Sequence, residues 1–420
     1  MDASAVSSHS TAGTRRVLWV RGLRAFGDGY VSLLLPAYLL QRGLSPLDVG
    51  ILATSTLVGS GAATLLVGLH AHRFGNQTLL VGAALLMTAT GLGLAAAGSF
   101  WPLLVVAFIG TLNPSSGDVS VFLPLEQAVL ARFAGDRQRT ALFARYSLVG
   151  ALAGAAGALC AAAPELYVAA TGASLATASQ AMFVLYAVLG CIAAVTYRGL
   201  PRESPVADCS SGRRRAALGP SHRIVLTLAA LFGLDAFAGG FIVQSMLALW
   251  LFGRFGLSMA AVGAVFFWTG ILAALSYLAA VRIARKLGLV NTMVFTHLPS
   301  SVLLLLVPLM PTPALAVALL LARSALSQMD VPTRNSYVMA VVTPPERAAA
   351  ASITSVSRSL ASSASPLLAG WLLGFSAFGW PLIIAGALKI VYDFALLATF
   401  RKLRPPEESA PAATPGEPAA

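Results

Sequence analysis

The chain has 420 residues, of which 57% are hydrophobic and only 10% are charged, and its mean hydropathy is +0.79. Soluble domains carry about 25% charged residues, so this composition excludes an ordinary soluble domain and indicates an integral membrane protein. The formal net charge of +12 would also suit a nucleic-acid-binding protein, but the arginines lie mostly in short segments between apolar runs. Their distribution is a signal of membrane topology, and we expect no nucleic-acid partner.

Apolar runs follow one another along the chain, each close to the ~20 residues that a helix needs to cross a bilayer. The sequence therefore predicts an all-α integral membrane protein with twelve transmembrane helices. We place these spans at about 17–40, 46–69, 77–98, 101–123, 140–163, 176–197, 223–252, 258–281, 288–309, 313–333, 347–374 and 379–400.

The two ends of the chain differ from the spans. Residues 1–16, rich in Ser, Thr and Ala, and residues 404–420, rich in Pro, Glu and Ala, are predicted to be disordered tails. No short apolar region with a small-residue cleavage site precedes the first span, so we expect no cleaved signal peptide.

The basic residues predict the orientation in the membrane. Of the 28 Lys and Arg residues, only Arg42 and Arg254 lie in the loops on one side, whereas most of the others lie in the tails and the opposite loops. Because basic loops stay in the cytoplasm, both termini are predicted to be cytoplasmic. We expect a multi-pass protein of the plasma (inner) membrane.

Two stretches half a chain apart share one layout. An apolar helix that leads into buried charges and a Pro-rich loop occurs at 101–139 and again at 314–347. Glu126 of the first stretch corresponds to Arg334 of the second at an offset of 208. A membrane helix that carries charges, present twice, is the central feature that a function must explain.

Further echoes divide the chain into two similar halves. The segment from Gly43 to Ser45 (Gly-Leu-Ser) recurs from Gly256 to Ser258, at an offset of 213. We assign an N-terminal half, a basic linker and a C-terminal half at 17–197, 198–222 and 223–403. Two six-helix halves related by a parallel repeat are one of the transporter architectures.

At residues 68–75 the chain reads Gly-Leu-His-Ala-His-Arg-Phe-Gly. This loop is similar to the Gly-x-x-x-Asp-Arg-x-Gly signature of the major facilitator superfamily, and residues 17–400 resemble that family. His72 stands where the family has Asp, and Asn76 and Gln77 stand where basic residues usually follow. The resemblance implies twelve helices in two pseudo-symmetric halves, a monomer, and a latch at this loop on the cytoplasmic side.

The fifth span carries Gly150, Gly154 and Gly157. This row looks like the family's antiporter motif, although Ala155 replaces its Pro, and it supports export. The alternative is close packing of small residues between neighbouring helices.

Most ionisable residues in or just past the predicted spans fall on spans 1, 4, 7 and 10. An ionisable side chain in hydrocarbon costs a few kcal/mol or more, so it normally faces an aqueous cavity or a partner. The resemblance implies that these four helices line a central cavity. Their ionisable residues are Arg21, Arg24, Asp28, Asp118, Glu126, Asp235, Arg323, Asp330 and Arg334, to which other spans add Arg145, Arg358, Lys389 and Asp393.

Three carboxylates are candidates for proton coupling: Asp28, Asp235 and Asp118. At ~1.5 Å per residue, Asp28 lies roughly 17 Å and Asp235 about 18 Å inside their spans, near the middle of the bilayer. Two alternatives stay open. Arg24 and Asp28, one turn apart, could form a neutral pair, and Asp235 could be a fixed partner of Arg24.

The remaining candidates concern the substrate and the gate. The substrate-cavity candidates are Arg24, Arg323, Asp330, Arg358 and Gln244, and the cytoplasmic gate candidates are Glu126, Arg334, Arg73, Arg139 and Arg347. Arg323 and Arg358 could hold an anionic substrate or only neutralise nearby acids. A bridge between Glu126 and Arg334 could close the inner mouth, unless the two are separately solvated.

Other ionisable groups have simpler interpretations. Lys389 and Asp393, four residues apart, are interpreted as a structural pair. His70 and His72 form a His-x-His without a third ligand, and the three cysteines are scattered. We therefore expect no metal site and no cofactor.

The sequence thus favours a secondary transporter, not an enzyme, with a small solute, protons and the lipid bilayer as its partners. No phosphate-binding GxxxxGK[ST] loop is present, so ATP does not drive it directly. Export by proton antiport is our first hypothesis. Proton-coupled uptake of a small anionic metabolite is the second, and a non-transporting membrane sensor or scaffold is the alternative of another class.

Overall fold

The computed structural model describes residues 3–70, 74–114, 120–133, 136–201, 221–343 and 346–400. Within these ranges every regular element is helical, which confirms the all-α fold class. The elements are α1 (Ala3–Gln41), α2 (Pro46–His70), α3 (Asn76–Ala96), α4 (Phe100–Ile109), α5 (Phe122–Phe133), α6 (Asp136–Cys160), α7 (Ala163–Thr171), α8 (Leu175–Arg198), α9 (His222–Gly240), α10 (Gln244–Phe255), α11 (Met259–Leu287), α12 (Leu289–Leu306), the 3₁₀ helix η1 (Val307–Leu309), α13 (Pro313–Leu326), α14 (Asp330–Val341), α15 (Arg347–Phe375) and α16 (Trp380–Phe400).

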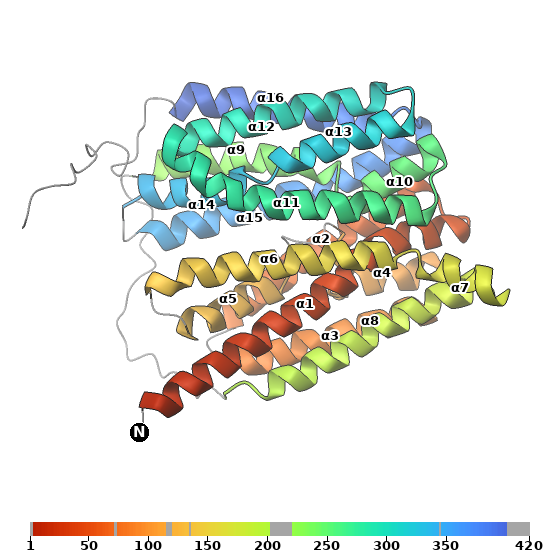
Figure 1. Ribbon diagram of the computed structural model, residues 1–420, viewed down its shortest axis with the longest axis horizontal. Helices are drawn as coiled ribbons and strands as arrows, with labels where there is room; N and C mark the ends of the chain where they lie inside the picture. The colour runs from red at the N-terminus through yellow and green to blue at the C-terminus, as the bar shows by residue number, and fades with distance from the viewer. Residues whose placement is uncertain are drawn as a thin grey trace, which may run out of the picture.

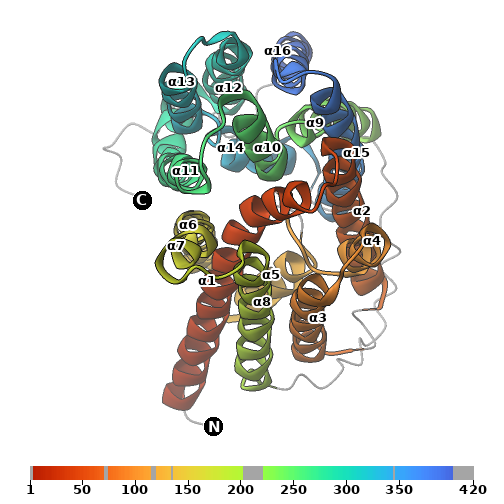
Figure 2. The same ribbon diagram turned by 90° about the vertical axis from the view of Figure 1, so that its right-hand side faces the viewer.

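Helices α1–α8 form one half of the molecule and α9–α16 form the other (Figures 1 and 2). We call the end where α1 begins and α8 ends the basic side, because Arg15, Arg16 and Arg198 lie there; the other end is the opposite side. Helix α1 begins at Ala3, so the described part of the segment that was predicted to be a tail continues this helix. The predicted C-terminal tail and most of the predicted linker lie outside the described residues.

The described residues contain eight helical stretches that are long and apolar enough to cross a membrane, and three shorter apolar helices. Predicted spans 4, 7 and 10 are each built from two helices, α4 with α5, α9 with α10, and α13 with α14. Pro124 and Pro332 lie in the first turn of the second helix of spans 4 and 10, where proline costs no helical hydrogen bond. The break in span 7 was not predicted.

The internal repeat has a local structural basis at the first turn on the opposite side of each half. Gly43 and Gly256 both adopt a left-handed backbone, with φ of 80° and 61°, which glycine reaches without strain. Two residues later, the hydroxyls of Ser45 and Ser258 each accept a hydrogen bond at 3.2 Å from the backbone of the next helix. The repeated Gly-Leu-Ser therefore stops one helix and starts the next.

Close contacts join the two halves toward the opposite side. A Cβ atom at Gly50, in the second turn of α2, would lie 2.5 Å from the carbonyl of Pro366 in α15. The backbone of Leu367 also donates to the Thr54 hydroxyl at 3.0 Å. On the other flank, a Cβ atom at Gly263 of α11 would lie 2.6 Å from the Ala158 carbonyl of α6. Small residues thus let the backbones of the two halves approach closely there.

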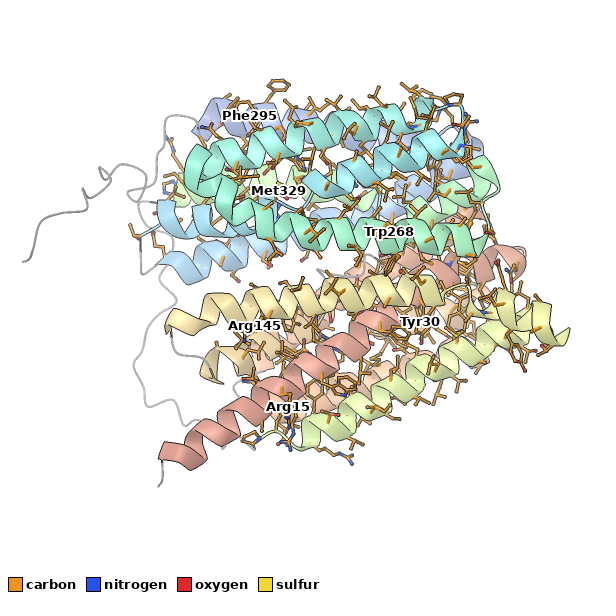
Figure 3. The ribbon with its side chains drawn as sticks, in the orientation of Figure 1. Arg15, Tyr30, Arg145, Trp268, Phe295 and Met329 are labelled. Atoms are coloured by element: carbon orange, nitrogen blue, oxygen red, sulfur yellow. The ribbon has the colours of Figure 1, made fainter. Side chains whose placement is uncertain are left out.

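The exterior of the bundle is apolar. Trp268 of α11 and Phe295 of α12 are more than half exposed, whereas Tyr30 of α1 is fully buried (Figure 3). Exposed aromatic and aliphatic side chains of this kind suit contact with lipid tails. Many of the charged side chains of the spans are instead buried inside the bundle.

Candidate functional site

In the N-terminal half, a buried ion pair joins span 1 to span 4. Arg24 of α1 donates to Glu126 of α5 at 2.7 Å, and their side chains are 3% and 0% exposed. Tyr146 of α6 and Tyr197 of α8 donate one hydrogen bond each to the same carboxylate. The Arg24 guanidinium also lies 3.7 Å from the centre of the Phe122 ring. The charge of Glu126 is thus fully enclosed by protein donors.

Asp28 lies one turn further along α1 and has a separate environment. It is 6% exposed and accepts a hydrogen bond from the Tyr186 hydroxyl of α8 at 3.0 Å. In this conformation Arg24 pairs with Glu126, whereas the alternative considered from the sequence was a neutral pair of Arg24 with Asp28. Asp28 is left with a neutral hydrogen-bond donor.

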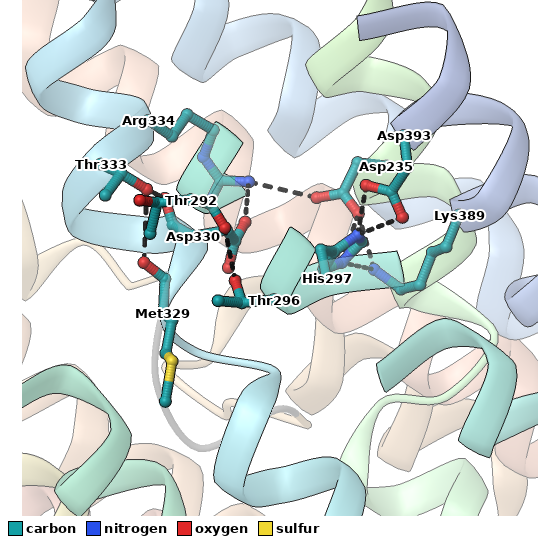
Figure 4. Close-up of polar contacts among 10 residues, drawn as sticks. All are labelled: Asp235, Thr292, Thr296, His297, Met329, Asp330, Thr333, Arg334, Lys389 and Asp393. Atoms are coloured by element: carbon teal, nitrogen blue, oxygen red, sulfur yellow. Dashed lines mark hydrogen bonds and ion pairs between the residues drawn. The ribbon is translucent and has the colours of Figure 1, made fainter. Parts of the chain in front are cut away.

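In the C-terminal half, Asp235 of α9 is the centre of a larger ionic network (Figure 4). It contacts Lys389 of α16 at 2.6 Å and Arg334 of α14 at 3.1 Å. Arg334 also pairs with Asp330 at 3.2 Å. All these side chains are at most 10% exposed. The sequence offered Arg24 as a possible partner of Asp235. In the structure Asp235 instead has its partners on spans 10 and 12.

His297 of α12 completes this network and was missed in the sequence. Its Nδ1 lies 2.9 Å from Asp393 of α16, and its Nε2 lies 3.6 Å from Asp235. Lys389 and Asp393, expected to pair with each other, instead bond to Asp235 and His297 respectively. A histidine within an apolar run, on the helix preceding span 10, was the available signal.

The two halves carry equivalent ion pairs with reversed signs. Arg24 and Asp235 correspond at an offset of 211, and Glu126 and Arg334 correspond at an offset of 208. Each half therefore joins its first span to its fourth span by a salt bridge, cation to anion in one half and anion to cation in the other. In this conformation Glu126 and Arg334 pair inside their own halves, so a bridge between them stays a prediction for another state.

The other substrate candidates are placed around these networks. Arg323 of α13 has a buried Nε without a hydrogen-bond partner among the described residues, and its charge interacts with that of Asp235. Arg358 lies half-buried on α15, and Gln244 is the first residue of α10. Asp118 and Arg73 lie outside the described residues, as do the side chains of Arg139 and Arg347.

Parts of the two sequence signatures also have a structural reading. Gln77, at one of the positions where the family usually has a basic residue, donates to the carbonyls of Arg198 and Leu200 at 2.7 and 2.9 Å. It thereby satisfies carbonyls at the end of α8. In span 5, a Cβ atom at Gly157 would lie 2.0 Å from the Phe26 carbonyl of α1, so close helix packing accounts for this glycine.

A cavity of about 30 Å³ lies toward the opposite side. Its walls come from α1, α2, the segment after α4 and the start of α10, so both halves contribute. The lining contains hydroxyl and amide groups but no charged side chain, and it comprises Val31, Ser32, Leu35, Pro36, Leu39, Val49, Leu52, Ala53, Thr56, Leu112, Asn113, Pro114 and Ser245. The hydroxyl of Ser245 is buried without a hydrogen-bond partner among the described residues.

Comparison with known proteins agrees with this architecture. The model of the Major Facilitator Superfamily matches residues 17–327 and 229–420. An uncharacterised membrane protein of Saccharomyces cerevisiae, YJR124C, is 24% identical over 419 residues, covering 92% of this chain and 93% of its own length.

Solved structures resemble the chain in fold. A bacterial homologue of the human lysosomal transporter Spinster, inward-facing and occupied, has a TM-score of 0.71 at 15% identity, covering 93% of this chain and 97% of its own. A mutant of the nucleoside transporter NupG reaches 0.72 at 15% identity, covering 92% and 100%. The inward-open xylose transporter XylE of E. coli reaches 0.69 at 14% identity, covering 93% and 95%.

Proposed function

Since the chain belongs to the Major Facilitator Superfamily, we propose that this secondary transporter exports a small solute in exchange for protons. The observation that supports proton coupling most directly is the set of buried ionisable residues near mid-span in both halves. Burying a charge in the membrane interior is costly, and such residues are kept where they carry ions or substrates. Asp28 and Asp235 are the proposed proton-coupling residues, and Asp118 is a third candidate.

The proposed mechanism is alternating access, in which the two halves rock around a central site. The contacts from α2 to α15 and from α6 to α11 lie toward the opposite side, which supports a state open toward the basic side. With both termini in the cytoplasm of the proposed plasma-membrane protein, this state would load solute from the cell. Release would require these contacts to separate while Glu126, Arg334 and the other gate candidates close the basic side.

The lining of the cavity supports a solute that is small and mainly apolar. The lining of this cavity has no charged side chain, and apolar pockets with a few polar groups bind uncharged parts of small molecules. The Ser245 hydroxyl would supply one hydrogen bond to such a solute. Export as the direction rests on the likeness of the span 5 glycines to the antiporter motif.

The second candidate function is proton-coupled uptake of a small anion. It is favoured by Arg323, whose buried Nε has no hydrogen-bond partner among the described residues. A guanidinium in such a place suits a carboxylate or phosphate ligand, and Arg358 of α15 would be its proposed co-ligand. This candidate differs from the first in the direction of flux and in the charge of the solute.

The deciding experiment uses the purified protein, expected to be a monomer, in proteoliposomes with a pH-sensitive dye inside and a proton gradient imposed. A panel of neutral amphipathic and anionic solutes is applied, beside the variants Asp28→Asn and Asp235→Asn. We expect a neutral solute to dissipate the gradient by antiport and at least one variant to lose this effect by tenfold or more. Inward flux of an anion together with protons would favour the second candidate, and unchanged variants would refute the assignment of both carboxylates.

A further inference from the structure

His297 lies inside the ionic network of the C-terminal half (Figure 4). The network contains the carboxylates of Asp235, Asp330 and Asp393 and the basic side chains of Arg334 and Lys389. Arg323 adds a third basic side chain, because its charge interacts with that of Asp235. The imidazole of His297 lies between groups of both signs, since it contacts Asp393 and Asp235 as well as Lys389.

The two ring nitrogens of His297 have different partners. Nδ1 lies 2.9 and 3.1 Å from the two oxygens of Asp393, so it carries a hydrogen and donates to that carboxylate. Nε2 lies 3.4 Å from the Lys389 ammonium and 3.6 Å from an oxygen of Asp235. The hydrogen on Nδ1 is therefore held by Asp393, and Nε2 is the nitrogen that can gain or lose a proton.

The identity of the partner of Nε2 depends on that proton. Without it, Nε2 is an acceptor and Lys389 can donate to it. With it, Nε2–H is a donor that faces the Asp235 oxygen to which Lys389 is bonded at 2.6 Å. The imidazolium and the ammonium then repel each other and compete for one carboxylate oxygen.

Asp235 is a less suitable place for the same proton. It contacts both Lys389 and Arg334, so protonating it would weaken two ion pairs, whereas protonating His297 strengthens its pairs with Asp393 and Asp235. The other ionisable groups that face the network are Tyr392 of α16 and Arg323 of α13. The described side chains of α11, which also packs against α12, contribute no ionisable group.

We propose that His297 is the proton-binding group of this network. A proton on Nε2 lets His297 donate a hydrogen bond to the Asp235 oxygen that otherwise accepts from Lys389. The proton enters from water and leaves to water, with no other bond made or broken. Because Asp235 also holds Arg334 of α14, the exchange reaches spans 7 and 10. The coupling of this exchange to transport rests on the proposed function; the proton site itself does not.

The first test measures protonation directly. The chain contains five histidines, and a variant in which the other four are changed to Gln retains only His297. With ¹⁵N-labelled histidine in lipid nanodiscs, spectra are recorded from about pH 9 down to about pH 5, and the proposal requires the Nε2 resonance to change from the imidazole to the imidazolium position. One unchanged protonation state across this range would overturn the proposal.

The second test measures the consequence for conformation without any solute. Spin labels at Arg198→Cys and Arg223→Cys, in a background without native cysteines, report the distance between the halves on the basic side. We expect the distance distribution to change with pH and to stop changing in His297→Gln, while His222→Gln at the exposed start of α9 behaves as wild type. His297→Lys, which keeps a positive charge, should also be independent of pH and guards against misfolding of the Gln variant.

A distance distribution that still changes with pH in both His297 variants would contradict the proposal. If instead His297 titrates and controls the distance, but no solute dissipates a proton gradient in proteoliposomes, the proton site stands and the proposed antiport fails.

Discussion

At the scale of single residues, some of the charges inside the spans form buried ion pairs. Glu126 illustrates this, since its carboxylate is 0% exposed and accepts from Arg24, Tyr146 and Tyr197. A buried ion pair is costly to assemble, but removing one partner is costlier because it leaves an uncompensated charge. The structural value of Glu126 is therefore to keep Arg24 satisfied inside the bilayer.

We expect Glu126→Gln to destabilise the purified protein by about 3 kcal/mol, because Arg24 would stay buried without its counter-charge. Thermal unfolding in detergent would show a lower midpoint. Glu165→Gln, at the first turn of α7, is the matched control and should cost only a few tenths of a kcal/mol.

Adding Arg24→Gln to Glu126→Gln should recover part of the lost stability, since both charges are then removed together. If the double variant lost as much stability as the two single variants lose together, the result would contradict an interaction between the two residues.

At the scale of helices, the packing of α6 on α1 decides how the span 5 glycines are understood. A Cβ atom at Gly157 would come within 2.0 Å of a backbone carbonyl of α1, whereas one at Gly154 would lie 3.5 Å from the nearest heavy atom. These two glycines share a helix and a sequence signature but differ in the space around them.

Gly157→Ala should therefore separate α6 from α1 and cost about 2 kcal/mol through overpacking. Gly154→Ala should be close to neutral, because its added methyl group makes an ordinary contact. Thermal unfolding of both variants checks the pair, and equal losses would mean that the signature acts other than through packing.

At the scale of the whole molecule, the two halves meet toward the opposite side through α2 and α15. The pair of Thr54 and Leu367 marks this contact, with a hydrogen bond of 3.0 Å. Alternating access requires the contact to open, so a covalent link there should trap the molecule open toward the basic side.

We expect a variant with Thr54→Cys and Leu367→Cys, in a background without the native cysteines, to lose transport after treatment with a short thiol crosslinker. Proteoliposome flux before and after treatment measures the loss, which should exceed tenfold. The matched control is Ala229→Cys with Ser357→Cys, a contact inside the C-terminal half, and its crosslinking should leave flux unchanged. Full flux after crosslinking of Thr54 to Leu367 would exclude a rocking of the halves at this contact.

Much of this molecule was determined by the sequence alone. Hydropathy gave the membrane class and most of the spans, because the requirement to bury a backbone in lipid acts on each segment separately. The sequence also revealed that Gly43 corresponds to Gly256 and Glu126 to Arg334, since a repeat is a property of the chain itself. These features depend on near neighbours in the sequence and on the bilayer.

The tertiary structure decided which charges meet. Lys389 and Asp393 suggested a local pair, yet they bond to Asp235 and to His297, which precedes Asp393 by 96 residues. Whether a buried charge finds its partner one turn away or on another helix depends on which faces the packed helices present to each other. That choice is made by the packing of all the spans at once, so no local pattern of residues contains it.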